Sequence, residues 1–195
     1  MSADRPDDRD GPEMSIADEV TVLLRAKSDR RAFEPLYRRY YPRISAYCRR
    51  RLDDLDDAAD ATSQTFAKAI AGVGGFTGGA VAPWLFTIAR HVVIDAVRAR
   101  RPRVDLAEVG ELVEPASGPV EIMIERDQRR ALRDAMAKLT AEQREVVELR
   151  LAGLTGQQIA DVLGVTLAAV KSSQFRAYTR LRALLADEHI FGDTP

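Results

Sequence analysis

The sequence predicts an all-α protein: two small helical domains joined by a flexible linker, the second ending in a helix-turn-helix. Apolar residues recur at helical spacing through both halves, and Ser, Thr or Asp precedes most of these segments as an N-cap would. Residues 104–119 lack this periodicity and contain Pro115. We therefore expect a disordered lead (1–14), a first domain (15–103), a linker (104–119), a second domain (120–187) and a tail (188–195).

Charge is abundant but segregated. Charged residues make up 30% of the 195 residues, yet the net charge is only -1. Acids dominate the first 15 residues and the linker, whereas bases cluster near Arg98 to Arg103 and on the last helix, which predicts two basic surfaces. The single Cys48 excludes an internal disulfide. No apolar run reaches membrane-spanning length, so we expect a cytoplasmic protein without membrane insertion.

The first domain begins with a short helix after Ser15, with acids in its first turn. Ser28 or Asp29 is positioned to cap a second helix, which runs to about residue 51. Pro42 falls inside that helix and is expected to kink or interrupt it, because proline lacks a backbone N–H.

The third and fourth helices frame a glycine-rich loop. Asp56 or Asp57 is expected to cap the third helix, which glycines end from Gly72 onward. The fourth helix, 84–101, combines Trp84 with a basic end. An aromatic ring beside cations suits single-stranded nucleic acid, although a solvated helix end explains the cations equally well.

The second domain ends in two helices joined by a short turn at Gly164. Capping boxes are expected for Thr140 with Gln143 and for Thr155 with Gln158. Thr166 then stands at the N-cap of a longer helix with a polar, basic face. This pattern is typical of a helix-turn-helix whose second helix enters a DNA major groove, and an ordinary helical hairpin is the alternative.

Signals for catalysis or metal binding are absent from the sequence. Only His91 and His189 are present, and neither has a partner at metal-ligand spacing. No Ser or Cys lies in a hydrolase-like motif. We therefore expect no catalytic residue, no metal and no cofactor, and no enzymatic activity.

Taken together, the two halves resemble a known bacterial family. The segments AFEPLYRRYYPRI, DAADATSQTF, APWLFTIARHVVIDAVRARR, LTAEQREVVELRLAGLTGQQIADVLGV and VKSSQFRA occur in the order and spacing of domains two and four of an extracytoplasmic-function (ECF) sigma factor of the sigma-70 family. The resemblance implies a non-catalytic subunit that binds core RNA polymerase and promoter DNA. It also implies control by an anti-sigma factor.

The resemblance also implies roles for particular residues. The third helix would contact polymerase through Asp57, Asp60, Ser63 and Gln64. The fourth helix and its preceding loop would melt and capture the minus-ten element through Phe76, Trp84, Arg90, His91, Arg98, Arg100 and Arg101. The last helix would read the minus-thirty-five duplex through Lys171, Ser172, Ser173, Gln174, Phe175, Arg176 and Arg180.

Two departures from the family pattern bear on these roles. Ser63-Gln64 replaces a more usual Gln-Glu pair, and Ser173 stands where a second basic residue is common. Three other functions remain open from the sequence: a stand-alone helix-turn-helix regulator, a helical nuclease or other enzyme, and an adaptor that binds polymerase without DNA.

Overall fold

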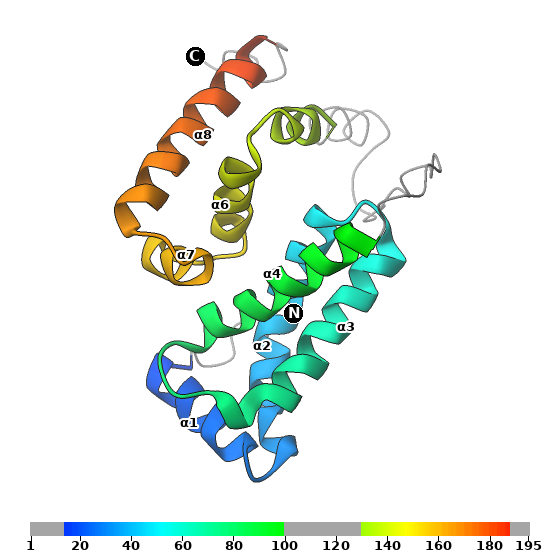
Figure 1. Cartoon of the computed structure of the whole chain (residues 1–195), viewed down its shortest axis with the longest axis vertical. Helices are drawn as coiled ribbons and strands as arrows, with labels where there is room; N and C mark the ends of the chain where they lie inside the picture. The colour runs from blue at the N-terminus through cyan, green and yellow to red at the C-terminus, as the bar shows by residue number, and fades with distance from the viewer. Residues whose placement is uncertain (1–13, 100–129, 188–195) are drawn as a thin grey trace, which may run out of the picture.

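The computed structural model describes residues 14–99 and 130–187, and all regular structure in these ranges is helical (Figure 1). The first half contains α1 (Ile16–Ala26), η1 (Arg30–Phe33), α2 (Glu34–Arg51), α3 (Leu55–Gly72), η2 (Val73–Gly75) and α4 (Val81–Ala99). The second half contains a helix over residues 130–137, then α6 (Ala141–Leu151), α7 (Gly156–Leu163) and α8 (Leu167–Asp187). The predicted linker and tail lie outside the described residues, and so does the predicted lead except for Met14.

Helix caps follow the sequence in most places. Ser15 forms a capping box with Asp18, and the Asp29 side chain accepts from the backbone N–H of Arg31 at the start of η1. Both capping boxes predicted in the second half are present, on α6 and α7. The Thr166 hydroxyl oxygen accepts from the N–H of Ala169, 3.2 Å away, and so caps α8.

The structure corrects two expectations for the first half: an interruption of the second helix at Pro42 and the cap of the third helix. Pro42 does not interrupt α2. Leu36 and Tyr40 before it and Ile44 and Tyr47 after it are all buried, so one apolar face continues through the proline. Burial of that face offsets the loss of one helical hydrogen bond.

The second correction concerns the start of α3. Its N-cap is Asp54, not Asp56 or Asp57. Asp54 Oδ1 accepts from the backbone N–H of Asp56 at 2.8 Å and from that of Asp57 at 3.0 Å. Asp53, Asp54, Asp56 and Asp57 offer locally similar caps, and it is the Asp54 side chain that accepts from the first free N–H groups of the helix.

The two halves share a hydrophobic core. The main cluster of buried residues combines side chains of α1 to α4 with Val146 and Leu149 of α6 and Ile159 of α7. Helix α7 packs beside α4, as Figure 1 shows. A smaller cluster lies between the 130–137 helix, α6 and α8 and contains Val147 and Ala177. Helix α6 therefore contributes to both clusters.

Gly164 makes the turn between α7 and α8. It is the C-cap of α7, with φ of 67° and ψ of 33°, and a Cβ added there would meet nothing within 4 Å. The cost of a side chain at this position therefore comes from backbone conformation alone.

We predict that Gly164→Ala lowers the free energy of unfolding by about 1 to 2 kcal/mol, because alanine is strained in the left-handed region. Urea unfolding measures the change. Gly72→Ala is the matched control, since Gly72 has φ of -89° and equally open surroundings. Equal effects of the two substitutions would contradict the explanation.

Candidate nucleic-acid interface

One side of α8 presents a mixed basic and aromatic surface. Lys171, Ser172, Phe175 and Arg176 are exposed, and Phe175 has 73% of its surface accessible. The guanidinium of Arg176 donates from Nη1 to the Ser172 hydroxyl at 2.8 Å. These four residues lie at positions i, i+1, i+4 and i+5, so they form one strip along the helix.

The other predicted readers on α8 have different surroundings. Ser173 is only 1% exposed and belongs to the inner face of the helix. Gln174 is half-buried, and its Oε1 accepts from Arg150 Nη2 at 3.0 Å. Arg180 is exposed and donates from Nε to the carbonyl of Lys138 at 3.1 Å. Burial therefore removes Ser173 from the exposed strip.

The loop before α4 is anchored by aromatic packing. Phe76 is 4% exposed, and its ring centroid lies 5.5 Å from that of the half-buried Trp84, edge to face. Lys27 at the end of α1 donates from Nζ to the carbonyl of Phe76 at 2.9 Å. Phe76 and Lys27 thus hold the base of the loop, and Trp84 borders it.

The remaining predicted minus-ten residues lie along α4 or beyond it. His91 and Arg98 are exposed. Arg100 and Arg101 lie outside the described residues. Arg90 is half-buried and turned toward the second half of the chain, where it has an acidic partner.

The predicted polymerase contacts share an outer face of α3. Asp60, Ser63 and Gln64 are exposed, and Asp57 is half-buried. Their spacing follows the helical repeat, while Ala61 and Thr65 on the opposite side are buried. The structure brings these four residues together on one surface.

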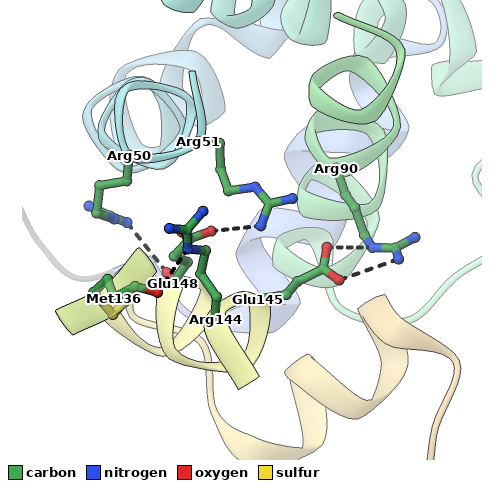
Figure 2. Close-up of polar contacts among 7 residues, drawn as sticks. All are labelled: Arg50, Arg51, Arg90, Met136, Arg144, Glu145 and Glu148. Atoms are coloured by element: carbon green, nitrogen blue, oxygen red, sulfur yellow. Dashed lines mark hydrogen bonds and ion pairs between the residues drawn. The ribbon is translucent and has the colours of Figure 1, made fainter. Parts of the chain in front are cut away.

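Helix α6 packs against α2, and arginine side chains of both α2 and α4 donate hydrogen bonds to oxygens of α6 and of the residue after it; we call these contacts the α6 junction (Figure 2). Arg90 of α4 donates to both carboxylate oxygens of Glu145, from Nε at 2.7 Å and from Nη2 at 3.4 Å. This is the two-pronged geometry that favours arginine over lysine.

Glu148 occupies the centre of the α6 junction. Its side chain is 2% exposed, and its carboxylate accepts from Nη1 of Arg51 at 3.1 Å. Arg50 donates to the backbone carbonyl of Glu148 at 3.3 Å. Burial raises the pKa of Glu148 to about 7, although Arg51 and Arg144 act to lower it.

A fourth arginine completes the junction at the turn after α6. Arg43 donates from Nε to the carbonyl of Ala152 at 2.8 Å. Its guanidinium lies 5.1 Å from the ring centroid of Tyr40 and 5.7 Å from that of Phe86. Gly153 has φ of 83°, and a Cβ there would lie 3.3 Å from Arg43 Nη2, so the turn requires glycine.

No sequence pattern indicated the α6 junction or the contact of Lys27 with the loop before α4. The junction partners are separated by 55 to 109 positions along the chain. No local spacing predicts such pairs. The available signal was charge alone: a basic end on the second helix and acids on the inner side of α6.

Residues 14–99 and 130–187 contain neither a membrane-spanning helix nor a cluster of metal-ligating side chains. None of the helices there has both the length and the apolar character needed to cross a bilayer. In the same ranges, no three His, Cys, Asp or Glu side chains gather as metal ligands would.

Comparisons with known proteins match both halves of the chain. The model for Sigma-70 region 2 matches residues 36–103, and that for Sigma-70, region 4 matches residues 129–181. The RNA polymerase sigma factor YlaC of Bacillus subtilis is 32% identical over 159 residues, covering 78% of this chain and 91% of YlaC. The ECF RNA polymerase sigma factor BldN of Streptomyces coelicolor is 36% identical over 163 residues, covering 80% of this chain but 61% of BldN.

Solved structures resemble this fold. The sigma factor RpoE from Bartonella quintana, crystallised with the anti-sigma factor NepR, superposes with a TM-score of 0.63 at 25% identity, covering 79% of this chain and 96% of RpoE. CnrH, solved with the cytosolic domain of CnrY, gives a TM-score of 0.68 at 24% identity, covering 87% of this chain and 97% of CnrH. The latter match concerns the fold alone.

The raised pKa of Glu148 predicts a pH-dependent stability. Its ordinary value is 4.5, so between pH 4.5 and about 7 the folded protein holds this proton more tightly than the unfolded chain. The stabilisation that this proton gives to the folded state is fully present below pH 4.5 and is lost as the pH rises through 7. We predict that Glu148→Gln stabilises the protein by about 2 kcal/mol at pH 8 and much less at pH 5.

Chemical unfolding at both pH values measures this difference. Glu142→Gln is the control, because Glu142 lies on the same helix but is exposed. A Glu148→Gln protein whose stability follows that of the parent at both pH values would rule out a buried, titrating Glu148.

Proposed function

We infer that this chain, which belongs to the ECF sigma factors of the sigma-70 family, directs promoter-specific initiation by core RNA polymerase. The observation that carries this conclusion is the presence of region 2 and region 4, in that order, in one chain. A stand-alone helix-turn-helix regulator has no need of region 2. That alternative is therefore excluded.

We propose that α8 reads the minus-thirty-five duplex through its exposed strip, Lys171, Ser172, Phe175 and Arg176. The strip offers hydrogen-bond donors for base edges and a ring for thymine methyl groups. Arg180 and Gln174 flank it. Ser173 supports α8 from the inner face, because its side chain is buried.

We propose that the loop before α4 captures an unpaired base of the minus-ten element. Extruding a base costs a few kcal/mol, so a preformed pocket must offset that cost. Trp84 supplies an aromatic edge, while Phe76 and Lys27 hold the loop in place. His91 and Arg98 are exposed on the same helix and would contact the strand, with Arg90 joining them when it is released from Glu145.

The outer face of α3 is the proposed docking site for core polymerase. Asp60, Ser63 and Gln64 are exposed there and Asp57 lies beside them. By family resemblance the partner is the coiled-coil clamp of the largest subunit. Docking places the chain in the bacterial cytoplasm and requires no catalytic group of its own.

An anti-sigma factor is a further proposed partner. RpoE of Bartonella quintana was crystallised with one, NepR, and its fold resembles this chain over 96% of its length. We propose that this chain is likewise restrained by a protein inhibitor.

Run-off transcription tests the proposed function. Purified chain and core RNA polymerase should initiate at discrete positions on genomic fragments, and core polymerase alone should not. Asp60→Arg together with Gln64→Arg should reduce this initiation by weakening the docking face, whereas Arg133→Glu, exposed on the 130–137 helix, should not. An absence of discrete transcripts would contradict the function.

Arg176 provides a sharper test of duplex reading. We predict that Arg176→Ala weakens holoenzyme binding to a minus-thirty-five duplex by about 1 to 3 kcal/mol and relaxes base preference at one position. Arg182→Ala, an exposed arginine nearer the end of α8, is the matched control. Footprinting titrations measure both variants. Unchanged affinity and base preference in Arg176→Ala would remove this residue from the reading set.

A further inference from the structure

Four arginines of the first half lie under α6. Arg43, Arg50 and Arg51 come from α2 and Arg90 comes from α4. Their hydrogen bonds in the α6 junction all end on oxygens of α6 or of the residue after it: two glutamate carboxylates and two backbone carbonyls. Figure 2 shows three of these arginines converging on one helix.

We propose that α6 is an intramolecular cover over a phosphate-binding surface of domain two, and that the backbone of nucleic acid competes with α6 for these four arginines. The inference rests on the proposed function only in taking nucleic acid as the polyanion. It adds a covered surface and a closed state to that function.

The chemistry of the covered surface favours phosphate. Glu145 presents two oxygens to Arg90 as a phosphodiester would, and the carbonyl oxygens of Glu148 and Ala152 occupy further acceptor positions. Removal of α6 would leave four guanidinium groups without these acceptors. A cluster of cations of this kind binds a polyanion in a salt-dependent manner.

A second arginine of α4 is exposed near the covered surface. Arg90 and Arg98 are eight residues apart, which places them about two turns apart along the helix and about 80° apart around it. Arg98 is exposed, whereas Arg90 has its side chain only 27% exposed against Glu145. Helix α6 thus covers one of these two arginines and leaves the other exposed.

Charge reversal tests whether the ion pair holds the chain closed. Glu145→Arg should open the chain and increase its radius of gyration in small-angle X-ray scattering. Glu142→Arg makes the same charge change on an exposed position of α6 and should leave the chain compact. Combining Glu145→Arg with Arg90→Glu restores an ion pair of opposite sense and should restore compactness.

Two scattering results would overturn the cover. One is a Glu145→Arg protein that is as compact as the parent. The other is a charge-swapped protein that stays as extended as Glu145→Arg alone, because the ion pair would then not be what closes the chain. Arg90→Glu alone provides an independent opening variant.

Fluorescence anisotropy with a labelled single-stranded oligonucleotide of scrambled sequence tests the phosphate surface. Glu145→Arg should bind about tenfold or more tightly than Glu142→Arg, with a steeper salt dependence. Adding Arg43→Gln and Arg50→Gln to Glu145→Arg should remove this gain. An open Glu145→Arg protein without the gain, or a gain that survives the two glutamines, overturns the assigned surface.

These measurements use neither promoter sequence nor polymerase. Their failure would therefore leave the run-off result intact, and a failed run-off assay would leave the scattering and anisotropy results interpretable.

Discussion

The burial of Glu148 beside Arg51 constrains how the two halves of the chain can separate. The glutamate side chain is 2% exposed and the arginine 18% exposed, so separating them without admitting water would leave a buried charge. Partial loosening of the α6 junction is therefore costly, whereas full separation lets water solvate both groups. For the opening proposed above, this constraint favours two discrete arrangements, closed and open, over a continuum.

Helix α6 packs on two sides, and these contacts determine which helices can move together. Its inner residues Val146 and Leu149 join the core of domain two, while Val147 packs with Ala177 of α8. Arg150 of α6 also donates hydrogen bonds to the carbonyl of Leu154, just before α7, and to Gln174 of α8. Because α7 packs on α4, the helix-turn-helix can move away with α6 only when both the α6 junction and the contact between α4 and α7 separate.

Local physics explains how much of the fold could be predicted from the sequence. Thr140, Thr155 and Thr166 cap the helices that they were expected to cap, because a side-chain acceptor at the right spacing suffices. Asp54 was missed because neighbouring aspartates are equivalent locally. The arginine contacts at Glu145, Glu148 and Ala152 could not be predicted, since only tertiary packing brings such distant segments together.

The recognition helix shows that spacing refines what a family resemblance supplies. The resemblance places Ser173 among the base readers. Counted from Val170, however, Ser173 is at i+3 and Ala177 at i+7, so Ser173 lies on the apolar, buried stripe of the helix. Helical periodicity alone was therefore enough to predict that its side chain is buried. The same periodicity leaves Lys171 and Phe175 on the opposite side. An exposed phenylalanine between cations has no packing role in the described structure, and this supports the proposed contact with thymine methyl groups rather than a structural role.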